Sequence, residues 1–540
     1  MKAPDGWPRT WPLLLFAAVA GGCFAVLRGA LDGPFISDDV GYIVANVYLH
    51  ELSFENVVAF FDPGSPAQIY AVGNYSPIHL LLHALEWQIF ADHTFGYHLL
   101  NVLVHALACT LLAALLLASR VPSTAALVGV LIFAVHPANV QAVAWISQLK
   151  STAGLAFALG ALLALSRRPW LGLLLFALGI LTKAAAAFAL PMAVALLWAR
   201  RAPARQWLWL GVWGLVFGAY VGVEFAEFRT RGWVDVPAFA DPWVHVRSVG
   251  AYATRYLVMA ATSWGVSAFQ EPDPVVSLLD PWWLASIPLA LLIGARAIFT
   301  LARREEEGAW WLAAIVSWLP ISQIFPFVHP MADHYLYFVL PGLIGGIALW
   351  ASRWRAGASL GVRRAALAAS LGLVVFFAWH SSMRAPLWQS DLLLSLDAAR
   401  HFPEGRTARL LRARSAAQAG DTASAVAELR GAEARGMFEF RVLELDPGLA
   451  PLRAEPAFRQ LVHDWAGLWI EWAERSGAST QSELRIVGLA HLKRDEFDAA
   501  VRAYERALAA GGRDPDGTRR DLEEARSLRI QRGGSDGKPL

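Results

Sequence analysis

The chain has 540 residues, of which 56% are apolar and 17% are charged, and its mean hydropathy is +0.42. This composition excludes a soluble domain of average makeup and indicates an integral membrane protein. The formal net charge of +2 gives no reason to expect a nucleic acid partner. Both cysteines, Cys23 and Cys109, lie in apolar stretches, which excludes a disulfide framework and a cysteine-based metal site.

The predicted fold class is all-α, a polytopic membrane bundle of about eleven spans, because a spanning helix needs roughly 20 apolar residues. The first apolar stretch lacks an A-x-A-like cleavage site and is followed by further spans, so we expect a retained signal anchor. The candidate stretches cover residues 11–28, 97–118, 123–136, 151–166, 170–183, 184–199, 206–224, 281–300, 309–326, 334–352 and 363–380.

Basic residues predict the orientation of these spans, because short cytoplasmic loops are enriched in Lys and Arg. Lys2 and Arg9 precede the first span, and basic clusters recur at every second connection after it. No Lys or Arg occurs from Gly29 to Ser119, so the first loop, residues 29–96, is predicted to face outward. Residues 225–280 are expected to hold a re-entrant or interfacial helix, since a full span there would invert every later loop. The N-terminus is then cytoplasmic and the C-terminus lies outside, in the periplasm if the membrane is a bacterial inner membrane.

After about His380 the composition changes to Ala, Arg and Glu with helical periodicity. The segments "EGRTARLLRARSAAQAGDTASAVAELRGA" and "SELRIVGLAHLKRDEFDAAVRAYERALAAGG" share a helix, a turn at Gly420-Asp421 or Arg494-Asp495, and a second helix rich in small residues. This plan resembles tetratricopeptide helix pairs. We predict a periplasmic tetratricopeptide-like domain over residues 384–530, which presents a polypeptide acceptor, recruits a protein partner or forms a rigid cap. Residues 531–540 are predicted to be a disordered tail.

Two adjacent acids stand in the first outer loop, within "DGPFISDDVGYIVAN". An ionised carboxylate on a loop held against the membrane can accept a proton from a substrate hydroxyl within hydrogen-bond reach. The alternative is a solvated loop that tolerates acids, because a pair of aspartates is weak evidence alone. A divalent metal near Asp38 and Asp39 stays open, but the sequence shows no closed ligand set and we predict none.

Polar residues within the predicted spans are functional candidates, because they cost free energy unless they face the protein interior or a cavity. His98, Asn101 and His105 are spaced by three and four residues and share one helical face. Hydrogen bonding between helices is the alternative for each of them. Further polar residues lie toward the predicted outer side: His136, Gln141, Trp145, Lys150, Lys183, His329, Asp333 and His334, with Arg255 on the suspected re-entrant helix.

The order of these segments is similar to that of a known enzyme family. The acidic loop is followed by "YSP", "GYHLLNVLVHAL", "FAVHPANVQAVAWIS", "LTK", "MADHYLY" and the tetratricopeptide-like tail. This order resembles the bacterial relatives of the tetratricopeptide-bearing transmembrane O-mannosyltransferases, which belong to the GT-C superfamily of polyprenyl-phosphate-sugar glycosyltransferases. The resemblance implies that residues 1–383 form a GT-C-like catalytic domain in the membrane.

The resemblance also implies an activity, the transfer of a sugar, with mannose as one candidate, from a polyprenyl-phosphate donor to a protein or glycan hydroxyl. Asp38 is the first candidate for the catalytic base and Asp39 the second. Relatives carry a Glu where this chain has Gln141 and an Arg where it has His334. We expect the donor phosphate at Lys150, Lys183, Arg255 and His334, although snorkelling to lipid headgroups is the alternative for the lysines. We expect the substrate cavity to be lined by Tyr42, His79, His98, Asn101, His136, Gln141, Asp333 and Tyr335.

Two other classes of membrane protein compete with this interpretation. An O-antigen ligase or polymerase also combines many spans with outer loops, but it concentrates its key residues in one late loop. A transporter or non-catalytic scaffold predicts charged groups along a path through the bilayer midplane. In this chain the ionisable residues gather near the predicted outer ends of the spans, which favours the glycosyltransferase.

Overall fold

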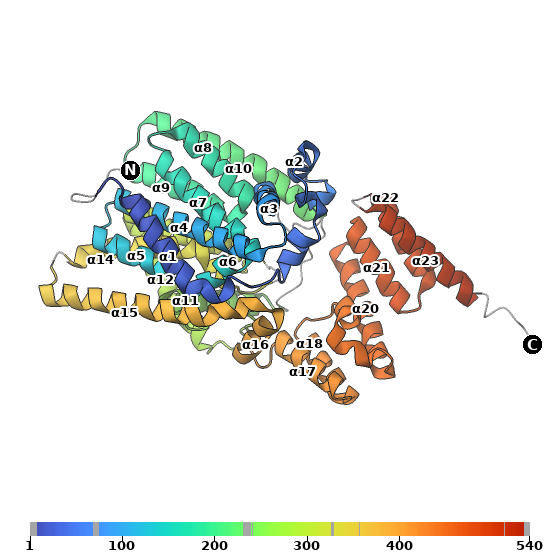
Figure 1. Cartoon of the computed structure of the whole chain (residues 1–540). Coiled ribbons are helices and arrows are strands. Elements are labelled where there is room, and N and C mark those ends of the chain that lie inside the picture. The colour runs from blue at the N-terminus through green and yellow to red at the C-terminus, as the bar shows by residue number, and fades with distance from the viewer. Residues whose placement is uncertain are drawn as a thin grey trace, which may run out of the picture. The chain divides into compact units, whose positions relative to one another are not determined.

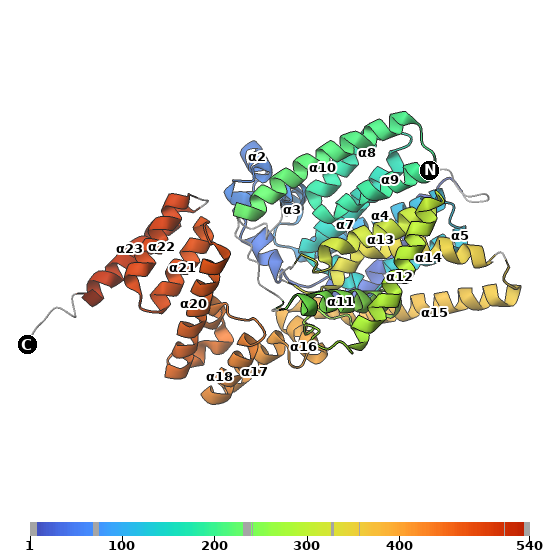
Figure 2. The same cartoon turned by 180° about the vertical axis from the view of Figure 1, so that it is seen from behind.

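The computed structural model describes residues 8–68, 75–230, 239, 241–325, 329–355, 357–511 and 514–533. Within these ranges the chain is helical, without strands and with one isolated bridge between Gln270 and Met331 (Figure 1, and from behind in Figure 2). The predicted all-α class is therefore confirmed. The chain divides into two compact units, one built chiefly from residues up to Asp397 and the other chiefly from Ala398 onward.

Seven helices in the described ranges are long and apolar enough to cross a membrane, as expected of a membrane-embedded helical protein. They contain α1 (Trp11–Leu27), α4 (Thr94–Ala118), α7 (Leu149–Ala164), α10 (Ala204–Thr230), α12 (Pro281–Ala302), α14 (Leu336–Arg355) and α15 (Leu360–Arg384). All seven fall on predicted spans.

The other four predicted spans contain shorter helices: α5 (Ser123–Ala134), α8 (Pro169–Thr182), α9 (Ala189–Ala199) and α13 (Glu306–Trp318). Helix α5 ends just before His136-Pro137, because a residue that precedes proline disfavours helical backbone. Helix α8 ends where Lys183 adopts an extended conformation, with φ −157° and ψ 128°. The total number of spans therefore stays a prediction.

Helix α4 packs against α1, α5 and α7 (Figure 1), and α13 packs against α14 (Figure 2). Glycine permits the close approach of the last pair. A Cβ atom built on Gly345 would overlap the buried Trp310 indole. The polar segments that precede α7 and α14 are positioned by this packed core.

The first predicted outer loop contains the helices α2 (Phe54–Phe61) and α3 (Pro77–Phe90). A single π-helical turn over Val40–Val44 follows the acidic pair and buries Tyr42 and Ile43. The loop passes close to the segment after α15, because a Cβ atom built on Gly33 would lie 2.7 Å from the Trp388 carbonyl oxygen.

The region predicted to hold a re-entrant or interfacial helix contains α11 (Pro242–Thr262). The helix ends at Ser263, which has a left-handed backbone with φ 58°. An irregular segment then leads to α12, so "YLVMAATSWGVSAF" is helical only in its first half. We refer to residues 263–280 as the α11–α12 loop.

The second unit contains the helix pairs that the sequence predicts. They are α17 (Arg406–Gln418) with α18 (Thr422–Glu433), and α21 (Gln481–Lys493) with α22 (Phe497–Ala510). Both predicted turns separate the helices, with left-handed backbone at Gly420 (φ 75°) and Asp495 (φ 59°). Helix α20 (Pro456–Ser476) lies between the pairs, and α23 (Pro515–Gly533) follows them. The predicted disordered tail begins within α23, and its remaining residues lie outside the described ranges.

Candidate functional site

The two acids of the first outer loop have different environments. Asp39 is 1% exposed, and its carboxylate accepts hydrogen bonds from the Ser147 amide at 2.7 Å, from the Ser147 hydroxyl and from the Ile36 amide at 3.2 Å. Burial raises the pKa of Asp39 to about 7, although these hydrogen bonds oppose the shift. Asp39 therefore attaches the loop to the segment before α7.

Asp38 is half-buried, and within the described ranges its carboxylate makes no hydrogen bond or ion pair. It lies within electrostatic range of the Tyr335 phenol. The Tyr335 ring in turn contacts the His334 ring, with 4.6 Å between the centroids. Of the two acids, Asp38 is the one whose oxygens are available to a ligand.

Lys150 and Lys183 come together although 33 positions separate them in the chain. Lys150 lies in the first turn of α7 and is 7% exposed, and its Nζ donates to the Tyr42 hydroxyl at 3.2 Å. The same ammonium stands 4.7 Å from the centroid of the Tyr42 ring. Nζ of Lys183 donates to Oγ of Ser151 at 2.7 Å and to Oε1 of Gln148 at 3.3 Å.

Neither lysine has a carboxylate within ion-pair distance in the part of the chain that the structure describes. Buried charges in proteins are ordinarily paired, because transfer of an ammonium group out of water costs several kcal/mol. Two neighbouring ammonium groups without a counter-ion also repel each other. This arrangement suits an anionic ligand, and the N-terminus of α7 adds a partial positive charge on the same side.

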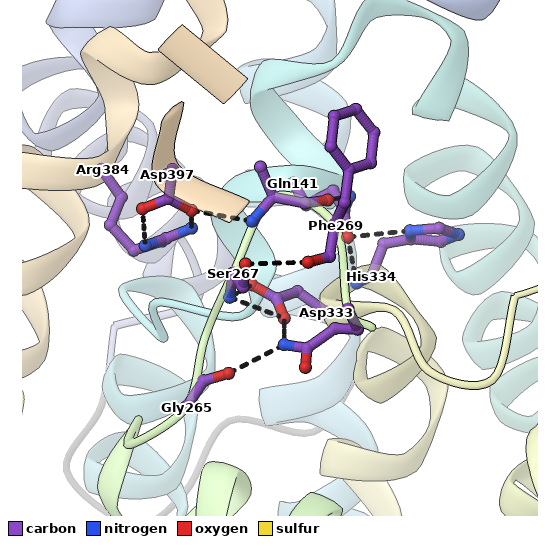
Figure 3. Close-up of polar contacts among 10 residues, drawn as sticks. Gln141, Gly265, Ser267, Phe269, Asp333, His334, Arg384 and Asp397 are labelled. Atoms are coloured by element: carbon purple, nitrogen blue, oxygen red, sulfur yellow. Dashed lines mark hydrogen bonds and ion pairs between the residues drawn. The ribbon is translucent and has the colours of Figure 1, made fainter. Parts of the chain in front are cut away.

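His334 belongs to the same region. Its ring lies within electrostatic range of Lys183 and Lys150, and it packs edge-on against the Trp145 ring at 5.9 Å. The His334 amide donates to Oε1 of Gln141 at 2.9 Å, and Nδ1 is 3.0 Å from the same oxygen (Figure 3). Gln141 therefore fixes His334 rather than facing a ligand.

A polar network secures the α11–α12 loop beside this region (Figure 3). The buried Asp333 accepts from the Ser267 amide at 2.9 Å and from Nε2 of Gln270 at 2.7 Å. Nε2 of Gln141 donates to the Ala268 carbonyl at 3.0 Å. The carboxylate oxygens of Asp333 thus accept hydrogen bonds from the protein itself. This residue, which was predicted to line the cavity, therefore has a structural role.

The Ala268 amide donates to Asp397 at 2.8 Å, and Asp397 is held by two hydrogen bonds from Arg384 at 3.2 and 2.9 Å (Figure 3). Helix α16 (Asp391–His401) supplies Asp397 and the end of α15 supplies Arg384. This buried ion pair joins α15 and α16 to the α11–α12 loop.

Other predicted cavity residues hold elements together. Nε2 of His98 bonds to the Gly33 carbonyl at 3.2 Å, and Nδ2 of Asn101 donates to the carbonyls of Trp145 and Ile146 at 3.2 Å. Nδ1 of His136 accepts from the Ala138 amide, and its Nε2 bonds to the Ala260 carbonyl, each at 3.1 Å. His105, which shares the helical face of His98 and Asn101 but was not predicted to line the cavity, bonds to the Tyr337 hydroxyl and the Ala134 carbonyl. For His98, Asn101 and His105 these contacts between segments agree with the structural alternative that the sequence left open.

Arg255 has surroundings of its own. Its guanidinium lies 5.0 Å from the centroid of the Trp282 ring, and its electrostatic partners are Asp280, Tyr252 and Asp273. The structure therefore gathers Lys150, Lys183 and His334 into one cluster and places Arg255 against acids of the α11–α12 loop.

Several residues of the cluster escape prediction from the sequence. Gln148 and Ser151 accept the Lys183 hydrogen bonds, and Ser147 holds Asp39. All three lie within three residues of Lys150 in the sequence. This proximity is the only feature of the sequence that could have identified them. His83 and Glu86 of α3 form a buried pair, with 2.5 Å between Nδ1 and Oε2.

No group of three His, Cys, Asp or Glu residues within the described ranges is close enough together to hold a metal ion. Comparison with known proteins found no match to a protein-family model, a curated protein or a solved structure.

Proposed function

We propose that this protein is a membrane glycosyltransferase of the GT-C type. It moves a sugar from a polyprenyl-phosphate donor to an acceptor hydroxyl on the periplasmic side of a bacterial inner membrane. The observation that carries the proposal is a pair of neighbouring ammonium groups, those of the buried Lys150 and the half-buried Lys183, which have no carboxylate partner in the described ranges. His334 and Tyr335 connect this cationic cluster to Asp38, whose carboxylate is not engaged by the described protein. The order of sequence motifs supports the same assignment.

In the proposed reaction the acceptor hydroxyl gives its proton to the Asp38 carboxylate as its oxygen attacks the anomeric carbon of the sugar. The new carbon–oxygen bond forms while the bond from that carbon to the phosphate oxygen breaks, with inversion at the carbon. The lipid phosphate leaves as a monoester with one more negative charge than it had in the donor. Lys150 and Lys183 stabilise this added charge, and they do so more strongly after bond cleavage than before it.

One carboxylate is enough for this chemistry. A phosphate is a good leaving group and needs no proton, unlike the leaving oxygen in glycoside hydrolysis, where a pair of carboxylates is used. We assign the role of proton acceptor to Asp38, because the carboxylate oxygens of Asp39 already accept hydrogen bonds from Ser147 and Ile36. Under the proposal the helix pairs of the second unit form a tetratricopeptide-like surface that presents a protein acceptor or binds a partner.

The first prediction concerns Asp38. The substitution Asp38→Asn removes the proton acceptor at nearly constant volume and is expected to lower sugar transfer by about 100-fold or more, on the scale of general base catalysis. Transfer is measured from a radiolabelled polyprenyl-phosphate sugar in membranes that contain the full-length protein. Glu55→Gln, at an exposed acid of α2 in the same loop, is the matched control and is expected to keep full activity.

Full transfer by a folded Asp38→Asn protein would refute the base assignment. If neither the wild type nor Glu55→Gln transfers sugar from any member of a panel of polyprenyl-phosphate sugars, the proposed donor class is refuted.

A further inference from the structure

His79 of α3 is buried, and its ring nitrogens lack well-formed hydrogen bonds within the described ranges. The side chain is 0% exposed, and neither ring nitrogen makes a hydrogen bond of ordinary geometry within the described ranges. Each neutral imidazole carries one donor and one acceptor, and buried polar atoms of this kind are rarely left alone. His79 therefore lacks a partner that a ligand could supply.

The His79 ring is held by aromatic packing instead of hydrogen bonds. It stands edge-on to the Tyr42 ring at 5.0 Å and 70°, and edge-on to the His83 ring at 4.4 Å and 67°. Glu86 holds His83 in turn through the 2.5 Å contact between Oε2 and Nδ1. The plane of the His79 ring is thus fixed from two sides. Neither nitrogen makes a hydrogen bond of ordinary geometry within the described ranges, and the Ser147 backbone is the one protein hydrogen-bonding group recorded close to the ring.

This oriented ring belongs to the lysine cluster. His79 lies within electrostatic range of Lys150 and Lys183 and near the Ser147 peptide. Tyr42 joins the two groups, because its ring contacts His79 and its hydroxyl accepts a hydrogen bond from Lys150. The cluster has an excess of donors, and an oxyanion supplies the acceptors that it lacks.

We infer that His79 donates a hydrogen bond to the same phosphate group that Lys150 and Lys183 bind, and that Tyr42 and the His83–Glu86 pair position its ring for this contact. The identity of the ligand as a lipid-linked phosphate rests on the proposed function. Burial, together with electrostatic interactions with His83, Lys150 and Lys183, lowers the pKa of His79, so the ring is neutral. It contributes a directed hydrogen bond, whereas the lysines contribute charge.

The experiment measures binding of a short-chain polyprenyl phosphate, and separately of inorganic phosphate, to the full-length protein in detergent by isothermal titration. His79→Phe keeps a flat ring between Tyr42 and His83 but removes both nitrogens. It is expected to weaken binding of either probe by about 10- to 100-fold, the range for a lost hydrogen bond to a charged group. His79→Gln keeps a donor and is expected to recover part of this loss.

His93→Phe, at an exposed histidine just before α4, is the matched control and is expected to bind like the wild type. The inference is overturned if His79→Phe binds both probes as the wild type does while Lys183→Met loses them. If His79→Phe fails to fold, His79→Gln is measured in its place. The inference is then overturned if His79→Gln binds the probes as weakly as Lys183→Met does. The titration measures phosphate binding and does not depend on sugar transfer. A protein that binds the phosphate but transfers no sugar would therefore contradict the proposed activity and not the role of His79.

Discussion

Lys183 offers a test in which stability and ligand binding should move in opposite directions. Lys183→Met replaces the ammonium with an apolar side chain of similar length. The lysine hydrogen bonds to Ser151 and Gln148 are lost, at a cost of about 1.5–3 kcal/mol each when the donor is charged. Against this, the substitution removes a half-buried charge that is partly desolvated and that repels Lys150.

The lost hydrogen bonds are partly compensated, because Oε1 of Gln148 still accepts from the Ser151 hydroxyl at 2.6 Å. We therefore expect Lys183→Met to stabilise the ligand-free protein by about 1–2 kcal/mol. Ligand should stabilise the wild type by roughly 2.7 kcal/mol at a concentration of 100 times the dissociation constant. The variant should show little of this gain, because it lacks one of the two charges proposed to bind the phosphate.

Thermal unfolding followed by intrinsic fluorescence, with and without a short-chain polyprenyl phosphate, measures both effects. Lys493→Met is the matched control, since Lys493 forms an ion pair of 2.7 Å with Glu444 in the second unit. It should cost less than about 1 kcal/mol and leave the ligand effect intact. If Lys183→Met destabilises the ligand-free protein by more than the control does, the ammonium is satisfied by the protein itself and the reasoning fails.

The remaining predictions concern two contacts of the candidate site. Burial raises the pKa of Asp39 from 3.8 to about 7, so the folded state binds this proton more tightly than the unfolded state. Asp39 should therefore lower stability as the pH rises from about 4 to about 7, and Asp39→Asn should flatten this slope in thermal unfolding; an unchanged slope would contradict it. Gln141→Glu and His334→Arg should each destabilise the protein, whereas the double variant should recover at least about 1 kcal/mol. Additive effects in that cycle would show that the two side chains are independent.

The helices were largely predictable from the sequence, because apolar stretches that must be buried or face lipid are visible as runs of residues. The lengths of the helices were less predictable than their positions. The predicted stretches 123–136 and 170–183 end within two residues of the ends of α5 and α8. The next predicted stretch starts at residue 184, but α9 begins only at Ala189, because a 3-10 helical segment over Ala184–Phe188 precedes it.

The candidate site was predictable in its residue types but not in its hydrogen bonds. Asp38 and Asp39 are neighbours of equal chemistry, and the sequence offers only their order to choose between them. Their environments differ because Ser147, which lies 108 positions away in the chain, donates hydrogen bonds to Asp39 and not to Asp38. For the same reason Asp333 becomes a structural residue, since its partners Ser267 and Gln270 lie 66 and 63 positions away.

Gln141 and His334, the two positions that differ from the motifs which the sequence resembles, are in contact in three dimensions. Taken along the sequence, Gln141 and His334 are separate losses of charge, 193 positions apart. In the structure Oε1 of Gln141 receives both the amide and the Nδ1 contact of His334. A Glu and an Arg at these positions would form an ion pair there, and the Gln and His keep the contact while they remove both charges. A neutral pair avoids the desolvation of two buried ions and leaves the charge balance around Lys150 and Lys183 unchanged. These two residues therefore give no physical reason to expect the loss of the proposed phosphate site.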